Sequence, residues 1–86
     1  MWRVIVRVSY TADSQSRLRN HVAALLTTMG LHNTVTGTWE APAVPLPLAA
    51  QQFGLVLQAL ANPQALVVGV DPQAVLNHLW VYLDRV

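Results

Sequence analysis

The sequence predicts a small α/β (α+β) domain in which strands and helices alternate along the chain. Three observations support this class. Residues 2–10 alternate between two sets of side chains, one of them entirely apolar or aromatic, as in a half-buried strand. Residues 18–29 repeat apolar side chains at the spacing of an amphipathic helix. Asn62-Pro63 and Asp71-Pro72 then divide the second half of the chain into further short elements.

The composition limits the core and suggests a partner. With 86 residues there is room for one domain, residues 1–86, which buries only a modest share of its surface. Apolar residues make up 53% of the chain and charged residues only 10%, against about a quarter in ordinary domains. One core of this size cannot hide so much apolar surface, so we expect the chain to form a homodimer.

Charge and cysteine content narrow the classes of function. The formal net charge of +1 gives no strong basic field for nucleic acid. The absence of cysteine removes disulfides, thiolate nucleophiles and cysteine-based zinc sites. No apolar stretch approaches the roughly eighteen residues of a membrane span, and the first one contains arginines, unlike a signal peptide. We therefore expect a cytoplasmic protein with no membrane partner.

The first strand has two distinct faces. Its core face carries Trp2, Val4, Val6, Val8 and Tyr10, and its second face carries Arg3, Ile5, Arg7 and Ser9. Asp13 or Ser14 is expected to cap the helix that follows. The apolar stripe of that helix consists of Leu18, Val22, Leu25, Leu26 and Met29, and Gly30 is placed to end it.

The middle of the chain predicts a strand, an extended connection and a second helix. Thr34–Glu40 alternates again, which favours one strand with a threonine-rich polar face. Residues 41–47 hold three prolines and are expected to be extended, with room for a short edge strand. Pro47 suits the first turn of a helix that continues to about Ala61.

The last third predicts a buried strand and a closing helix. Ala65–Val70 is a short continuous apolar run, typical of a strand covered on both faces. Asp71 is a good N-cap, with Pro72 at the first helical position. The closing helix is expected to use Val75, Leu76, Leu79, Trp80 and Leu83, although residues 78–83 also fit a strand.

These elements favour a ferredoxin-like βαβ(β)αβ sandwich with a C-terminal helix, in which the proline-rich segment supplies the bracketed strand. The alternative is a small three-stranded parallel sheet, which right-handed βαβ crossovers also allow.

Few residues are available for chemistry. The best candidate pair is Asp13 and Asp71, each just after a predicted strand, where two carboxylates can hold hydrated Mg²⁺. Both also fit plain helix N-caps. His21 is expected to be exposed beside the helix stripe, His32 to lie in the loop after Gly30, and His78 on or beside the apolar face of the last helix.

The second face of the first strand is the more informative surface. It is expected to join Thr34, Thr36, Thr38 and Glu40, with an Arg7–Glu40 pair across the strands. Arg3, Arg7, Arg17 and Arg19 are the candidate nucleic-acid contacts. A base-stacking sheet needs aromatic residues on this face, but Trp2, Tyr10 and Trp39 are predicted on the other one.

Residues 6–40 resemble the small ferredoxin-like subunit of CRISPR spacer acquisition and the related virulence-associated D proteins. The matching residues are Val8-Ser9-Tyr10, Arg17, Arg19-Asn20, Val22-Ala23, Leu25-Leu26, Gly30-Leu31 and Trp39-Glu40. The resemblance implies a dimer formed through the sheets and a metal-binding aspartate directly after the strand-one tyrosine. Here that position is Thr11, and Asp13 comes two residues later.

The sequence thus favours a non-catalytic dimeric interaction module that holds nucleic acid or a protein partner and needs no cofactor. One alternative is a divergent Mg²⁺-dependent nuclease that uses Asp13. The other is a small-ligand regulatory domain, for which this fold is often reused.

Overall fold

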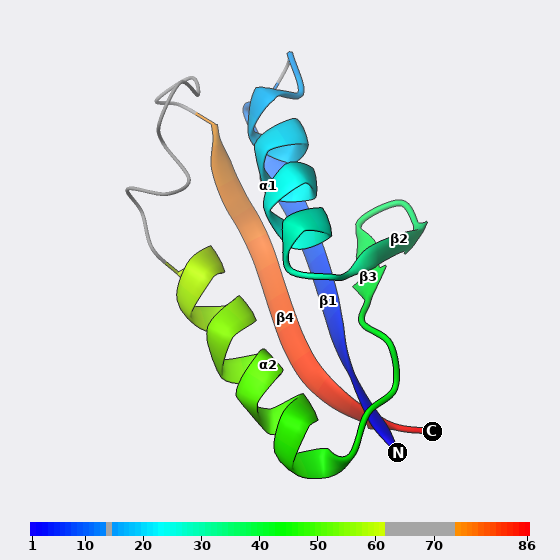
Figure 1. The fold of residues 1–86 in the computed structure, drawn as a ribbon. Coiled ribbons are helices and arrows are strands. Elements are labelled where there is room, and N and C mark those ends of the chain that lie inside the picture. Colours follow the sequence, from blue (N-terminus) through cyan, green and yellow to red (C-terminus); the bar gives the residue numbers. More distant parts are fainter. Residues whose placement is uncertain (14, 62–73) are drawn as a thin grey trace.

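Strands and helices alternate in the computed structural model, which describes residues 1–13, 15–61 and 74–86 (Figure 1). The elements are β1 (Trp2–Thr11), α1 (Arg17–Thr28), β2 (His32–Val35), β3 (Thr38–Glu40), α2 (Leu46–Leu60) and β4 (Val75–Arg85). The four strands form one antiparallel sheet in the order β2-β3-β1-β4. The mixed α+β class is confirmed, and the parallel-sheet alternative is wrong.

Both helices pack on the same face of the sheet (Figure 1). The core between them contains Val4, Val6 and Val8 from β1, Leu18, Val22 and Leu26 from α1, and Val56 and Leu60 from α2. Tyr10 and Trp39 pack against its margin. The predicted core face of the first strand is therefore confirmed. No described element covers the opposite face, which we call the open face.

The start of α1 differs by a few residues from the prediction. The N-cap is Ser16, a left-handed residue (φ 57°) whose side chain makes no capping bond. The side chain that caps the helix is that of Asp13, three residues before Ser16. Its Oδ1 accepts from the backbone N–H of Leu18 at 3.0 Å, and its Oδ2 accepts from that of Arg19 at 2.9 Å. These are donors that the first turn of a helix otherwise leaves unpaired.

The strand predicted at Thr34–Glu40 is wrong, because this segment is part of a hairpin. β2 ends at Val35, a turn occupies Thr36 and Gly37, and β3 begins at Thr38. Gly37 has φ +76° and its carbonyl accepts from the N–H of Val8 at 2.9 Å. The turn requires the left-handed backbone that glycine adopts freely. His32, expected in a loop, is the first residue of β2.

The second helix matches its prediction within one residue at each end. The preceding connection is extended, and within it Val44 forms an isolated antiparallel bridge with Trp2. Gln52 of α2 donates to the carbonyl of Met29 at 3.3 Å, which links α2 to the end of α1. No described helix has both the length and the apolar character needed to cross a bilayer.

The predicted closing helix is wrong, and the alternative of a strand over residues 78–83 is confirmed: the segment forms β4, an eleven-residue strand paired with β1 along its whole length. Leu79, Val81 and Leu83 lie opposite the core residues of β1, and Leu76 lies opposite Tyr10. A register shift separates Leu76 from His78, so the two side chains occupy opposite faces despite their even spacing. This bulge disguises the strand periodicity and leaves apolar residues at helical spacing.

The strand predicted at Ala65–Val70 and the cap predicted at Asp71 lie outside the described residues.

Candidate functional site

The open face is built by the register of β1 with its neighbours. Arg3, Ile5, Arg7 and Ser9 lie opposite Asp84, Tyr82, Trp80 and His78 of β4, in that order. On the other side of β1, Ile5 lies opposite Glu40 and Arg7 opposite Thr38. Opposed residues share a face, so all of these side chains belong to one surface. The predicted polar face of β1 and β3 is therefore present, and β4 adds aromatic residues to it.

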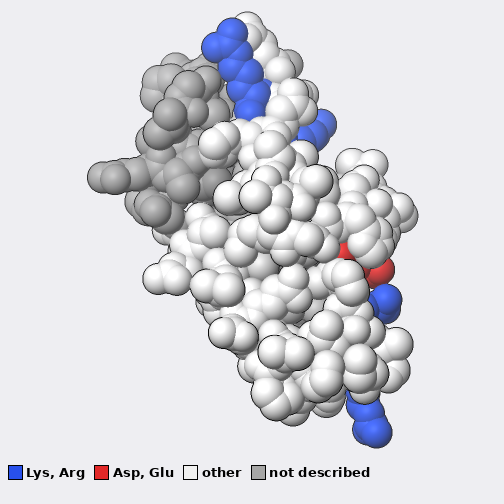
Figure 2. All heavy atoms as spheres, in the orientation of Figure 1, with Lys and Arg blue, Asp and Glu red and all other residues white. Residues whose placement is uncertain are grey.

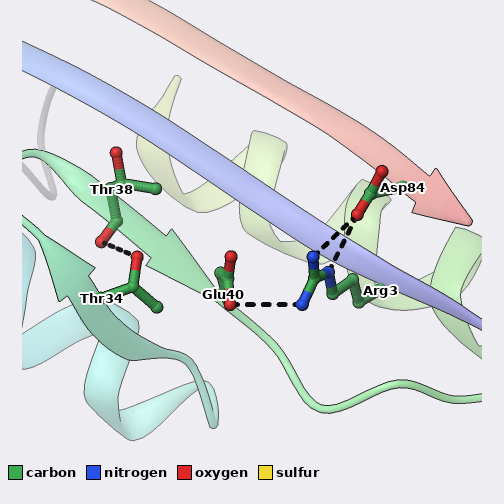
Figure 3. Close-up of polar contacts among 5 residues, drawn as sticks. All are labelled: Arg3, Thr34, Thr38, Glu40 and Asp84. Atoms are coloured by element: carbon green, nitrogen blue, oxygen red, sulfur yellow. Dashed lines mark hydrogen bonds and ion pairs between the residues drawn. The ribbon is translucent and has the colours of Figure 1, made fainter. Parts of the chain in front are cut away.

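One end of the open face is held by three charged side chains. Arg3 donates through Nε to Oδ2 of Asp84 at 3.0 Å, and its Nη1 lies 3.4 Å from Oε2 of Glu40 (Figure 3). The guanidinium thus joins β1 to both neighbouring strands. The predicted Arg7–Glu40 pair is wrong, because the register places Glu40 opposite Ile5. Both carboxylates on this face are therefore gathered around Arg3.

Ile5 is buried on the open face, with only 3% of its surface exposed. Its cross-strand neighbours are Tyr82 and Glu40. The chain itself therefore supplies the dry environment that this aliphatic residue requires.

The other end of the open face is hollowed into a small pocket of about 150 Å³. We call it the Arg7 pocket; it is lined by Arg7, Val8, Ser9, Thr36, Gly37, Thr38, His78 and Trp80. The Ser9 hydroxyl and Nδ1 of His78 lie 3.4 Å apart. A guanidinium, an imidazole and hydroxyl groups thus converge on a space no larger than a small polar group needs.

Aromatic rings stand beside this pocket. The guanidinium carbon of Arg7 lies 5.6 Å from the centre of the Trp80 ring, within cation–π range. The rings of His78 and Trp80 are 5.8 Å apart and tilted by 34°. Trp80 is 56% exposed and Tyr82 is 42% exposed, so a ligand can reach both. In the part of the chain that the structure describes, Arg7 has no carboxylate partner.

Sequence reasoning missed these aromatic residues because it placed them on a helix. The prediction that the open face lacks aromatic residues is therefore wrong. The available signal was the alternation of Leu79, Val81 and Leu83 with Trp80 and Tyr82. This alternation allows a strand over residues 78–83, but the bulge after Leu76 puts Val75, Leu76, Leu79 and Leu83 at helical spacing, which favours a helix over the longer segment.

A groove runs over the outer edge of β4. It encloses about 550 Å³ and is lined by Arg7, Leu57, Leu79, Trp80, Val81 and Tyr82. Leu57 comes from α2, so this edge groove connects the helix layer with the open face. Among the described strands, β4 is the last in the sheet order and has no partner on this side.

The surface over the helices is poor in charge. In Figure 2, blue and red atoms lie at the margins of the view, and the surface over α2 is white. Helix α2 contains no charged residue, and four of its leucines are exposed: Leu46, Leu48, Leu55 and Leu57. Exposed apolar side chains grouped on one surface are typical of a protein contact.

The four candidate nucleic-acid arginines are not brought together. Arg3 and Arg7 lie on the open face, but Arg17 and Arg19 lie in the first turn of α1, on the other side of the sheet. The guanidinium of Arg19 stands 5.4 Å from the ring centre of Tyr10, and both line a separate cavity of about 430 Å³.

Asp13, the candidate catalytic and metal-binding residue, is also at the start of α1. Both of its carboxylate oxygens already accept backbone hydrogen bonds. The described residues contain no cluster of three or more His, Cys, Asp or Glu side chains. Asp71, its predicted partner, lies outside the described residues. The nuclease alternative therefore stays a prediction from the sequence.

The histidines lie in different places. His21 is half-buried on α1, and His32 lies opposite Glu40 at the start of the hairpin. His78, expected beside the apolar face of a helix, instead lines the Arg7 pocket.

The chain shows no significant match to any protein-family model, curated protein or solved structure. The resemblance in the N-terminal two fifths therefore stays a prediction.

Proposed function

We propose that the chain is a non-catalytic interaction module of ferredoxin-like fold that works as a homodimer, joined through the outer edges of two β4 strands. The sheet order β2-β3-β1-β4 supports the fold assignment, because each helix crosses over one intervening antiparallel strand. The dimer is supported by the character of β4 itself.

The observation that carries this proposal is that β4, the outermost of the described strands, lacks the residues that usually protect a sheet edge. Natural proteins normally guard a sheet edge with charged residues, proline or very short strands, because the unpaired backbone groups attract another strand. β4 is eleven residues long, and residues 75–83 contain no Asp, Glu, Lys, Arg or Pro. Its bulge lies near one end, after Leu76, and leaves residues 78–85 regular.

A second copy of this chain suits that edge better than an unrelated strand does. Antiparallel pairing of two β4 strands about a two-fold axis near Trp80 places Asp84 beside the partner's Leu76, so no like charges meet. The edge groove of each protomer brings the exposed Leu57 to the same contact. Backbone hydrogen bonds and apolar burial then act together.

The mass in solution tests this proposal. We expect light scattering at micromolar concentration to give twice the 9.4 kDa of one chain. Leu57→Lys introduces a charge into the edge groove, and its repetition across the two-fold axis should shift the protein towards monomers. Far-ultraviolet circular dichroism of this variant should stay unchanged, because Leu57 is 39% exposed.

Val35→Lys is the matched control. Val35 is an exposed aliphatic residue on β2, the opposite edge of the sheet, so its replacement should leave the dimer intact. A monomeric wild-type chain would rule out the homodimer. A dimer broken by Leu48→Lys but not by Leu57→Lys would move the interface from the edge of β4 to the outer side of α2.

A further inference from the structure

We propose that the open face binds a short stretch of single-stranded nucleic acid, with one phosphate in the Arg7 pocket and a neighbouring base stacked on Trp80. This site goes beyond the proposed dimer and does not depend on it, because every residue that carries it lies on one protomer.

The Arg7 pocket has the chemistry of a phosphate site. Arg7 supplies a guanidinium with several N–H donors, and Ser9 and Thr38 supply hydroxyl groups that can donate to phosphate oxygens. Arg7 lacks a carboxylate partner within the described chain, whereas Arg3 has two. No described residue therefore neutralises the positive charge of Arg7. The volume of about 150 Å³ is large enough for one phosphate group.

The adjoining aromatic residues form a stacking platform. Trp80 and Tyr82 are two positions apart on the same face of β4, which separates them by about 6.8 Å along the strand. Both are exposed, so the faces of bases can reach them. Stacking on aromatic rings accepts any base, because every base has a π face. Two successive bases can therefore occupy this platform while the phosphate contacts Arg7.

The charge distribution limits the length of the site. Asp84 lies opposite Arg3, four residues along β1 from Arg7, or about 13 Å away, and Glu40 lies opposite Ile5, two residues or about 7 Å from Arg7. These carboxylates disfavour a further phosphate at that end of the open face. A duplex does not fit this arrangement, because its bases are paired and stacked on each other. The ligand is therefore a single strand, contacted over a few nucleotides.

Fluorescence anisotropy with labelled oligothymidine tests the proposal. We expect the wild type to bind a single strand at low salt, and a duplex of the same length at least about tenfold more weakly. Trp80→Leu keeps an apolar side chain but removes the ring, and should weaken binding by roughly tenfold or more.

Arg7→Gln should also weaken binding and should lower the dependence of log Kd on log salt by about one phosphate contact. Trp80→Leu should leave that salt dependence unchanged, which separates the two roles. Arg85→Gln is the matched control, because Arg85 is an exposed cation that lines neither the Arg7 pocket nor the edge groove. Its affinity should stay close to that of the wild type.

Three results would overturn the proposal: no binding of single strands by folded wild-type protein at low salt, equal affinity for single strand and duplex, or undiminished affinity in both Arg7→Gln and Trp80→Leu. Leu57→Lys should retain the affinity per protomer. A monomer that binds single strands therefore contradicts only the dimer, and a dimer that does not bind contradicts only this site.

Discussion

Tyr10 lies where the end of β1 meets the first turn of α1. Burial raises its pKa from 10.0 to about 12; nearby Arg19 lowers this pKa and Asp13 raises it, each by less than burial. Because Asp13 also caps the helix, the environment of the phenol depends on the correct start of α1. The ionisation of Tyr10 therefore depends on the local structure of this junction.

The titration of Tyr10 gives a prediction with a definite sign. A phenol with a higher pKa in the folded chain keeps its proton there after the unfolded chain has lost it. Stability is therefore retained below about pH 10 and falls as the pH rises towards about 12. We expect Tyr10→Phe to remove this loss of stability at high pH. Denaturant unfolding at several pH values measures the free energy of unfolding.

Tyrosinate absorbance in a Tyr82→Phe background supplies the direct measurement, because Tyr10 is then the only tyrosine. A midpoint near pH 10 would contradict the buried environment.

Among the elements, the β2–β3 hairpin depends most on a single residue. Gly37 has φ +76°, and a Cβ built on it would lie 2.7 Å from the carbonyl oxygen of Val8. That oxygen belongs to the backbone of β1 and has little room to move. The hairpin can therefore lie this close to β1 only if this position has no side chain.

Two glycine substitutions separate backbone strain from this collision. Gly30 also has a positive φ, of +90°, but nothing lies within 4 Å of a Cβ placed there. We expect Gly30→Ala to lower the free energy of unfolding by about 1 kcal/mol, and Gly37→Ala by about 2–3 kcal/mol. Chemical denaturation measures both. Equal losses would mean that the close approach to Val8 carries no cost.

The sequence patterns predicted those elements whose apolar residues face one core. β1, α1 and α2 each combine a regular apolar stripe with a boundary residue, and all three are confirmed. The hairpin was missed because Thr34–Glu40 continues to alternate across its turn, so periodicity alone does not reveal Gly37 as a corner. The segment of β4 favours a helix in the sequence because its apolar residues fit both the helical and the strand period. Only pairing with β1 decides between the two.

The candidate site also depends on whether residues 75–85 form a helix or a strand. Arg3, Arg7 and Ser9 were assigned to the correct face, because they follow from the strand period of β1. Trp80 and His78 reach the open face only through long-range pairing, which a local pattern does not contain. Arg17 and Arg19 are expected as phosphate contacts at the start of the first helix, and α1 carries them to the other side of the sheet.

At the scale of the whole molecule, Arg3 connects three strands that are distant in sequence. It contacts Asp84 of β4 and Glu40 of β3 from its position on β1. The three side chains are partly exposed, so each pair contributes little by itself. Together, the two pairs link β3 and β4 to β1 through one side chain.

Removal of this guanidinium should weaken the sheet modestly. We expect Arg3→Met to lower the free energy of unfolding by up to about 1 kcal/mol, because it also leaves two carboxylates facing each other across β1. The loss should shrink near 1 M salt, where charges are screened within about 3 Å. Arg85→Met, which breaks no ion pair of the described chain, serves as the control in the same denaturation series.

The strand order also has a consequence during synthesis. β1 is made first, yet its longest partner, β4, is the last of the described elements to leave the ribosome. At about 5–20 residues per second, the roughly 60 intervening residues take about 3–12 s to add. Throughout that interval one side of β1 has no native partner, and its valines are covered only by the elements already made. This side of β1 therefore stays open to mispairing until β4 has been made, and pairing with β4 ends that risk.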